Sequence, residues 1–270
     1  MKRLGEVYRT ALVTGGTSGL GESFCGLLLR EGVDVTSVSR YPEVLPAKDG
    51  FRGEKLDLSD AEATQAFTHD FLAEHGAPDL LVNNAGYGAF YEWANFPEEE
   101  IGRQVETLLT GPARLCQAFA PAMAERGSGG IVNVSSIAGL FPLPYMPMYN
   151  AAKAGLSAFS ASLALEYAQV PFVVDFRLGD FRTNFNAAAK RGKESEPDSA
   201  VGRAWVQIEK QLDDSPEADE AARALRRILV RGLSGVTYAG GFFQAQVAPV
   251  LFRLAPKSWL RAILRKRYGL

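Results

Sequence analysis

The sequence predicts an α/β fold: a single doubly wound parallel sheet of the Rossmann type with helices on both faces. Apolar, β-branched runs alternate with helical patterns over most of the chain, and runs without polar alternation are typical of strands covered on both faces. No Pro/Gly-rich linker, internal repeat or low-complexity stretch divides the 270 residues. We therefore expect one domain over residues 1–270, with its ligand beyond the carboxyl ends of the strands.

The expected elements follow one another along the chain. Strands are expected at residues 10–14, 33–39, 51–57 (the weakest pattern), 79–83, 130–134 and 172–176. Helical patterns lie between them at 19–31, 60–75, 97–126 and 146–169. A polar, charged segment follows at about 184–216 and contains a helical pattern at Val201–Leu212. We interpret this segment as a lid over the ligand.

Composition and charge narrow the class of protein. A content of 47% hydrophobic residues supports a large core, and a formal net charge of −2 without a long basic stripe argues against nucleic acid as a partner. The first ten residues are too short and polar for a signal peptide, and no apolar run is long enough to span a bilayer, so we expect a cytoplasmic protein. Cys25 and Cys116 are interpreted as buried thiols in a reducing compartment. Because His69 and His75 do not share a helix face, no metal is expected.

The turn after the first strand, Thr14–Gly21, has the sequence Thr-Gly-Gly-Thr-Ser-Gly-Leu-Gly and leads into an amphipathic helix. Glycines at 15, 19 and 21 permit φ > 0 and a close approach of the backbone to a ligand. Free N–H groups and the positive helix end suit a pyrophosphate. The spacing G-x-x-x-G-x-G differs from the usual G-x-G-x-x-G, and a plain strand-to-helix turn is the alternative.

The second strand ends in Ser39-Arg40, about 18 residues after Gly21. An Asp or Glu at this distance binds the ribose 2′-hydroxyl of NAD. Serine followed by arginine suits a 2′-phosphate instead, although an arginine in this place is also compatible with a solvated loop charge. The sequence therefore favours NADP over NAD.

Polar residues also follow the next two strands. The third strand ends at Asp57, and the fourth leads into Asn83-Asn84-Ala85-Gly86. Such a turn can hydrogen-bond its own backbone, and it can equally form a floor for an adenosine. The structural and functional interpretations are compatible here.

Together with Ser135-Ser136 and Tyr149-Asn150-Ala151-Ala152-Lys153, these motifs resemble the short-chain dehydrogenase/reductase family over residues 9–185. The resemblance implies that Ser136, Tyr149 and Lys153 are catalytic. It implies a homodimer or homotetramer, with the helices at 97–126 and 146–169 as the interface. It also implies a set of NADP-binding residues: Gly15, Thr17, Ser18, Gly19, Leu20, Gly21, Ser39, Arg40, Asp57, Leu58, Asn83, Ala85, Gly86, Tyr149, Lys153, Gly179 and Thr183.

The spacing of the catalytic residues has a chemical reason. Tyr149 and Lys153 are four residues apart and share one helix face. Reducing a ketone requires a hydride on carbon, which the cofactor supplies, and a proton on oxygen. A phenol with a pKa near 10 transfers protons poorly at pH 7, and we expect the Lys153 ammonium to lower the pKa of Tyr149. Ser136, at the end of the fifth strand, would donate a hydrogen bond to the carbonyl oxygen.

We therefore expect an NADP(H)-dependent oxidoreductase that interconverts a ketone or aldehyde with an alcohol on a small, apolar substrate. The alternative is a nucleotide-binding regulatory or scaffold protein of the same fold with weak or no turnover. The alternative is motivated by Leu108, which replaces the Asn whose backbone helps to hold a proton-feeding water in the resembled family. A backbone carbonyl, Thr107 or Thr110 would take over that role in an active enzyme. A second departure is Leu178, which stands where the family usually has Pro.

Two further regions bear on the substrate and on partners. Apolar residues close to the catalytic positions suggest a wall for an apolar substrate: Phe141, Leu143, Tyr145, Met146, Met148 and Phe185. Residues 253–270 carry six basic residues and no acidic one, and Trp259, Leu260, Ile263, Leu264 and Tyr268 are expected on one face of a helix at about 256–268. Such a helix packs against the body or a second subunit, which we favour, or binds a membrane surface.

Overall fold

The computed structural model describes residues 3–42, 49–192 and 198–270, and within them seven parallel strands form one sheet in the order β3-β2-β1-β4-β6-β7-β9. The strands are β1 (Thr10–Thr14), β2 (Asp34–Ser39), β3 (Phe51–Lys55), β4 (Leu80–Asn83), β6 (Gly130–Ser136), β7 (Phe172–Leu178) and β9 (Gly235–Ala239). Six of them confirm the predicted strands to within two residues. The edge strand β9 was not predicted, and it ends directly before Gly240-Gly241.

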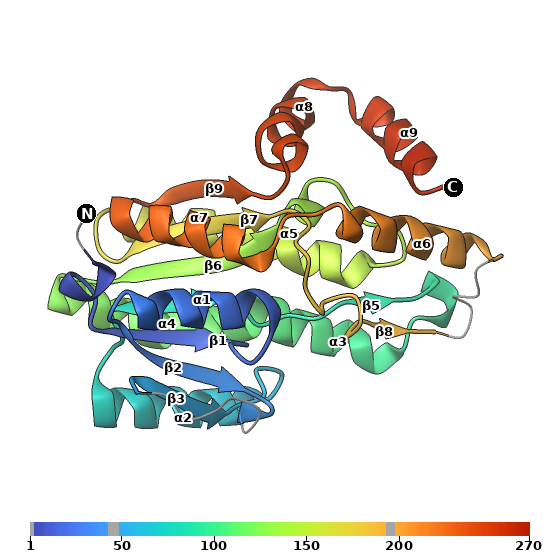
Figure 1. Ribbon diagram of the computed structural model, residues 1–270. Helices are drawn as coiled ribbons and strands as arrows, with labels where there is room; N and C mark the ends of the chain where they lie inside the picture. The colour runs from blue at the N-terminus through green and yellow to red at the C-terminus, as the bar shows by residue number, and fades with distance from the viewer. Residues whose placement is uncertain (1–2, 43–48, 193–197) are drawn as a thin grey trace.

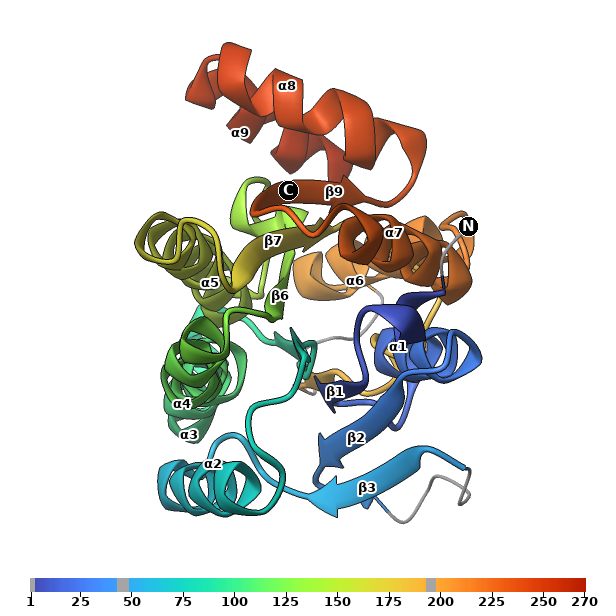
Figure 2. The same ribbon diagram turned by 90° about the vertical axis from the view of Figure 1, so that its left-hand side faces the viewer.

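Helices cover both faces of the sheet, as Figure 2 shows. One side carries α1 (Gly19–Arg30), α6 (Ala200–Asp213) and α7 (Ala218–Arg231). The other carries α2 (Ala61–His75), α3 (Glu98–Val105), α4 (Gly111–Arg126) and α5 (Pro147–Glu166). A π-helical turn, η4 (Glu106–Thr110), joins α3 to α4, so the helix predicted at 97–126 is continuous but locally widened.

Two apolar clusters hold these layers together. Phe24 and Leu28 of α1 pack with Leu225 of α7 against one face of the sheet, and Phe119 of α4 packs with Phe71 of α2 against the other. Leu12 and Leu80 are fully buried in the sheet between them. The continuous apolar runs of the central strands are therefore explained by burial on both faces.

The end of the chain adds a layer beyond β9, drawn in red at the top of Figure 1. It consists of a π-helical turn η7 (Phe243–Val247), α8 (Ala248–Leu254) and α9 (Lys257–Arg267). The structure has a helix where the C-terminal helix was predicted, and the apolar residues predicted for one of its faces are only partly packed on the body. Leu260 and Tyr268 are buried, whereas Trp259 and Ile263 are exposed. None of the helices in the described part of the chain combines the length and apolar character that crossing a membrane requires.

Chain order reverses between β1 and β4, since β1, β2 and β3 run outward one way and β4, β6, β7 and β9 the other. At such a switch point the loops leaving neighbouring strands diverge and open a crevice at their carboxyl ends. The fold therefore places Thr14–Gly21 and the turn after β4 side by side at this edge.

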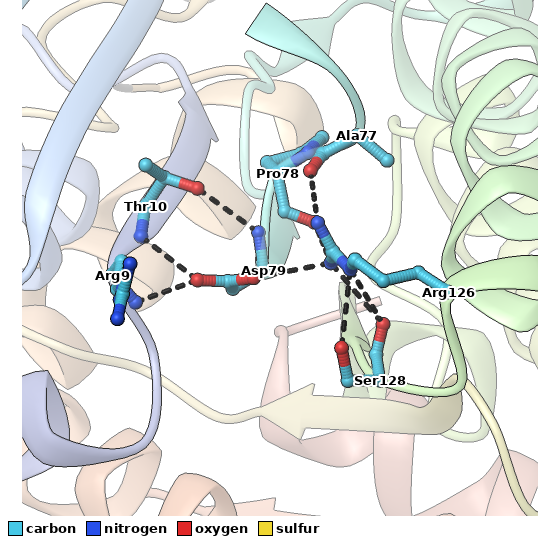
Figure 3. Close-up of polar contacts among 7 residues, drawn as sticks. All are labelled: Arg9, Thr10, Ala77, Pro78, Asp79, Arg126 and Ser128. Carbon is cyan, nitrogen blue, oxygen red and sulfur yellow. Dashed lines mark hydrogen bonds and ion pairs between the residues drawn. The ribbon is translucent and has the colours of Figure 1, made fainter.

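A polar cluster lies at the opposite end of the sheet, at the amino ends of β1 and β4, as Figure 3 shows. Asp79 Oδ2 accepts hydrogen bonds from the backbone N–H groups of Arg9 (2.6 Å) and Thr10 (3.2 Å), which lead into β1. Arg126 forms an ion pair with Asp79 Oδ1 at 3.1 Å and donates to the carbonyl of Ala77 at 2.6 Å. The cluster ties the entrances of β1 and β4 to the end of α4.

Arg126→Ala should lower the free energy of unfolding by about 1–3 kcal/mol, because it leaves buried carbonyl groups without donors. Urea denaturation of both proteins measures this difference. Arg126→Lys keeps the charge but not the forked donor geometry, so its free energy of unfolding should lie between those of the wild-type and alanine proteins. Equal stability of the wild-type and alanine proteins would contradict the assigned role.

Candidate active site

A cavity of about 360 Å³ lies at the carboxyl ends of the strands, where the ligand was expected. All but one of the predicted site residues line it: Gly15, Thr17, Ser18, Gly19, Leu20, Gly21, Ser39, Arg40, Asp57, Leu58, Ala85, Gly86, Ser136, Tyr149, Lys153, Gly179 and Thr183. They come from the ends of β1, β2, β3, β4, β6 and β7 and from α1 and α5. The remaining one, Asn83, lies beneath the cavity wall.

The glycine-rich turn is shaped by close packing on its neighbours. Gly15 and Gly19 have φ of +70° and +57°, a region that favours glycine. A Cβ on Gly21 would lie 2.1 Å from the carbonyl oxygen of Gly15, and one on Gly15 would lie 2.8 Å from Cα of Ala85. The glycines are therefore required by contacts within the protein, and the turn forms a cradle open toward the cavity.

The two asparagines after β4 have different surroundings, and only Asn84, which was not among the predicted site residues, lines the cavity. The Asn83 amide donates to Oδ1 of Asn133 at 2.8 Å and is buried in the sheet. Asn84 lines the cavity and donates to the carbonyls of Thr14 (3.0 Å) and Gly15 (3.3 Å). The turn therefore braces the glycine-rich loop rather than mainly its own backbone.

The end of β2 offers free polar groups to a ligand. Ser39 Oγ is buried, lines the cavity and has no hydrogen-bond partner among the described residues. Arg40 follows it and is exposed, with its guanidinium 5.8 Å from the Tyr41 ring centroid. An unpartnered hydroxyl beside a cation fits a phosphorylated ribose, as the sequence predicts for NADP.

Asp57 lies at the same corner of the cavity. Its carboxylate accepts a hydrogen bond from Ser59 Oγ at 2.7 Å and pairs with Arg103 at 2.9 Å. Burial raises the pKa of Asp57, but the Ser59 hydrogen bonds and the Arg103 and Arg40 guanidinium groups outweigh burial, and the net pKa is lowered. Asp57 therefore stays ionised, as an acceptor for an adenine amino group requires. Sequence reasoning missed Arg103, since a single arginine on a helix carries no signal of its own.

The proposed catalytic residues form one wall of the cavity. Ser136 ends β6, and its Oγ accepts a hydrogen bond from the N–H of Ala138 at 3.0 Å. Tyr149 and Lys153 are buried on successive turns of α5. Lys153 Nζ donates to the carbonyl of Val134 at 2.7 Å and lies 6.0 Å from the Tyr149 ring centroid. The two side chains share a helix face, as the spacing predicts.

The predicted lowering of the Tyr149 pKa by Lys153 is wrong. Burial raises the pKa of Tyr149 to about 12, a hydrogen bond with Ser136 opposes this, and the charge of Asp180 adds to it. The Lys153 ammonium is instead engaged by a backbone carbonyl. Tyr149 is therefore a protonated phenol at neutral pH.

Burial also acts on Lys153, lowering its pKa to about 8, while the negative charge of Asp175 opposes the change. Asp175 is a buried carboxylate on β7 that pairs with Arg177 at 2.6 Å and accepts hydrogen bonds from Ser135 and Ser157. Its field favours the charged form of Lys153. The lysine thus titrates close to neutral pH.

Leu108 fills the place where the resembled family has asparagine. Its side chain is fully buried in η4, and its Cδ2 would lie 2.9 Å from a Cβ built on Gly86. Thr110 donates its hydroxyl to Glu106, whereas Thr107 lines the cavity together with Lys153. Of the two threonines considered as replacements, Thr107 is therefore the one that faces the site.

The substrate side is partly as predicted. Leu143, Met146 and Phe185 line the cavity, and the Phe185 ring centroid lies 5.7 Å from that of Tyr149. Tyr145 and Met148 do not line it. Leu178, which stands where the resembled family usually has Pro, is the last residue of β7 and lines the cavity.

Asp180 was not predicted as a site residue, although a charged residue just after β7 was the available signal. It lines the cavity, donates its N–H to Gln244 Oε1 at 2.9 Å and accepts from Gln244 Nε2 at 2.5 Å. Burial raises the pKa of its carboxyl group. Its charge is one of the influences that keep Tyr149 protonated.

The segment interpreted as a lid covers one side of the cavity, and its residues 193–197 lie outside the described part. Short strands β5 (Ala89–Phe90) and β8 (Lys190–Arg191) pair in parallel and attach it to the body. Lys190 lines the cavity and pairs with the buried carboxylate of Glu100. The Trp205 ring of α6 contacts Phe90 at a centroid distance of 4.8 Å.

Curated proteins of similar sequence bear the names of oxidoreductases. The chain is 30% identical over 259 residues to the 3-ketodihydrosphingosine reductase of Bacteroides thetaiotaomicron, and the match covers 92% of each protein. It is 39% identical over 163 residues to the probable oxidoreductase EphD of Mycobacterium tuberculosis. That match covers 57% of this chain and spans only 28% of the length of the mycobacterial protein.

Solved structures share the fold. A short-chain dehydrogenase from Streptomyces avermitilis has a TM-score of 0.78 and 33% identity over 96% of both chains. An alcohol dehydrogenase from the archaeon Thermococcus sibiricus, complexed with 5-hydroxy-NADP, has a TM-score of 0.71 and 25% identity over 87% of this chain and 97% of that one. Structures of this fold have been solved with NADP, NADPH and NADH. The family profile described as short chain dehydrogenase matches residues 9–193, more than half of the chain. The chain therefore belongs to the short-chain dehydrogenases, a family of NAD(P)-dependent dehydrogenases and reductases.

Proposed function

We propose that the protein is an NADP(H)-dependent oxidoreductase that interconverts a ketone or aldehyde with an alcohol on a small, apolar substrate. The observation that carries the proposal is the meeting, in one cavity, of the glycine-rich cradle with Ser136, Tyr149 and Lys153. The Bacteroides relative bears the name of a reductase of a keto compound, which supports the reaction class.

Preference for NADP is supported by the corner at the end of β2. Ser39 Oγ and the exposed Arg40 would hold the 2′-phosphate, and Asp57 would accept a hydrogen bond from the adenine amino group. Thr183, beyond β7, and Lys153 would hold the nicotinamide end. The bound cofactor supplies the hydride that is transferred.

In the direction of reduction, this chain has to place a proton on the carbonyl oxygen. Tyr149 is protonated at neutral pH and would donate it, and the hydroxyl of Ser136 would orient the same oxygen. Lys153 places a buried positive charge near the developing phenolate, and the charge of Asp175 helps to retain it. Leu143, Met146 and Phe185 would exclude water from the reacting carbon.

An assay of NADPH oxidation against a panel of aliphatic and aromatic ketones and aldehydes tests the proposal, with cofactor affinity measured separately by calorimetry. Turnover of at least one carbonyl class is expected. Tight binding of NADPH without oxidation by any of them would favour the second candidate, a nucleotide-binding regulatory or scaffold protein, for which Leu108 in place of asparagine is the supporting observation.

The rate of carbonyl reduction should fall as the pH rises through about 8, because Lys153 loses its charge above its lowered pKa. Alcohol oxidation should instead rise with pH, since it needs the deprotonated form of Tyr149. A pH–rate profile in both directions measures this. In Lys153→Arg, whose cation persists throughout this range, the decline in reduction should disappear even if the rate is lower. An unchanged decline in that variant would contradict the assignment.

We also propose a cytoplasmic homodimer or homotetramer. Two free cysteines, Cys25 and Cys116, support a reducing compartment.

The oligomer is proposed from an exposed stripe of small and apolar side chains on α5, formed by Ala151, Ala158 and Leu165, which another helix can approach. Leu165→Glu should therefore yield monomers in sedimentation velocity experiments. A wild-type protein that is monomeric at micromolar concentration and fully active would contradict this.

A further inference from the structure

The end of the chain exposes an unusual amount of apolar surface. Of the sixteen large hydrophobic side chains that are exposed among the described residues, eight lie within residues 242–270. This segment is about a tenth of the chain, so chance exposure does not account for the enrichment. Here the C-terminal surface means its exposed apolar members on η7, α8, α9 and the residue before η7: Phe242, Phe243, Val247, Val250, Leu254, Trp259 and Ile263.

Packing of the C-terminal helices on the body leaves this surface exposed. Leu260 and Tyr268 of the α9 segment are only 6% and 4% exposed and hold the helix in place, while Trp259 and Ile263 remain 68% and 52% exposed. Figures 1 and 2 show α8 and α9 as the outermost layer, beyond the edge strand β9. One face of α9 thus packs on the rest of the protein, and another face points outward.

The segment that carries this surface has charged residues of one sign. Residues 242–270 contain six Lys and Arg residues and no Asp or Glu, in a chain whose net charge is −2. Four exposed cations of α9 form no ion pair with any carboxylate in the described part of the chain: Lys257, Arg261, Arg265 and Lys266. Arg267 instead lines a cavity together with Asp180. Exposed aromatic and aliphatic side chains beside unpaired cations are the combination that binds the interface of an anionic bilayer.

We propose that the C-terminal surface docks this protein on an anionic lipid bilayer, with Trp259, Ile263 and Leu254 in the interface and the α9 cations at the headgroups. A second copy of the chain fits the surface less well. In a two-fold contact the same patch meets itself, which would bring two sets of unpaired cations together.

Docking also places a second cavity between the bilayer and the catalytic wall. This cavity, of about 90 Å³, is lined by Phe243 and Ile263 from the C-terminal surface and by Ser136 and Asp180 from the site. Its other lining residues include the apolar Phe141, Leu251, Leu260 and Leu264 and the polar Gln211, Gln244 and Arg267. If the proposed carbonyl chemistry holds, an apolar substrate dissolved in the bilayer would approach Ser136 by way of this cavity. The docking itself does not depend on that chemistry.

Flotation of the full chain with vesicles tests docking without reference to turnover. Vesicles of phosphatidylglycerol mixed with phosphatidylcholine should carry the protein, and pure phosphatidylcholine should carry much less. Binding should weaken when salt is raised to about 1 M, where the screening length is about 3 Å. Arg261→Glu/Arg265→Glu should reduce the partition coefficient at least about 25-fold, since each cation near such a surface contributes about fivefold.

Matched variants test whether vesicle binding depends on the C-terminal surface itself, or only on the net charge of the protein or on any exposed tryptophan. Lys55→Glu/Lys210→Glu changes the net charge equally on exposed sites elsewhere and should bind nearly as well as wild type. Trp259→Ser should lose binding to vesicles. Trp93→Ser, which changes another exposed tryptophan, on η3 (Trp93–Asn95), should keep it. Quenching of Trp259 fluorescence by brominated lipid should accompany binding. Equal flotation with both vesicle types, equal loss in both charge variants, or a Trp259→Ser protein that changes oligomeric state without a change in flotation would each overturn the proposal.

Discussion

Tyr149→Phe is expected to lower kcat for carbonyl reduction on the order of a thousandfold, with a far smaller change in the affinity for NADPH. The substitution removes one oxygen atom from a buried wall and leaves the ring contact with Phe185 in place. The loss should therefore appear mainly in the proton transfer and much less in folding or cofactor binding. Steady-state kinetics with calorimetry of NADPH binding measures both quantities.

Tyr145→Phe is the matched control. Tyr145 is four residues away and packs against Phe90 at a ring-centroid distance of 5.4 Å, but it does not line the cavity. Its variant should keep nearly full activity. A Tyr149→Phe enzyme with a rate close to that of wild type would show that another group supplies the proton.

Arg40→Ala is expected to narrow the preference for NADPH over NADH by about 1.5–3 kcal/mol, a factor of roughly 10 to 150 in relative affinity. The guanidinium is exposed next to Ser39 and would meet the 2′-phosphate that only NADPH carries. Affinity for NADH should hardly change. Binding of both cofactors to both proteins, measured by calorimetry, gives the difference directly.

Arg52→Ala provides the comparison for this second prediction. Arg52 lies on the neighbouring strand β3 and pairs with Glu54 at 2.8 Å, outside the cavity. Removing the Arg52 side chain should leave the preference for NADPH over NADH unchanged. Equal affinities of the wild-type protein for NADPH and NADH would remove the basis for assigning NADP.

Most of the sheet was predictable, because continuous apolar runs such as Ala11–Val13 and Leu80–Val82 have few other uses than buried strands. The edge strand β9 was not, since Val236 is exposed and the strand lacks such a run. The helix α7 was also missed, although its buried Leu225, Ile228 and Leu229 recur at helical spacing. In that case the signal was present in the sequence.

At the site, residue types were predictable and their surroundings were not. Neighbouring asparagines after a strand point to different sides, so only the fold distinguishes buried Asn83 from Asn84 at the glycine-rich loop. The pKa of Tyr149 depends on burial by elements distant in sequence, which outweighs the lysine one helical turn away. Exposure of Trp259 likewise depends on how α9 docks, which its helical periodicity does not determine.

Isotope transfer from NADPH tests the central claim most directly. The protein is mixed with NADPH deuterated at the transferable C4 position and with a ketone from the panel, and the alcohol is analysed by mass spectrometry. The account predicts one deuterium on the carbinol carbon of the product, and a much slower appearance of the same labelled product with Tyr149→Phe. Failure to transfer deuterium to any carbonyl class, by a folded protein shown to bind NADPH, would contradict it.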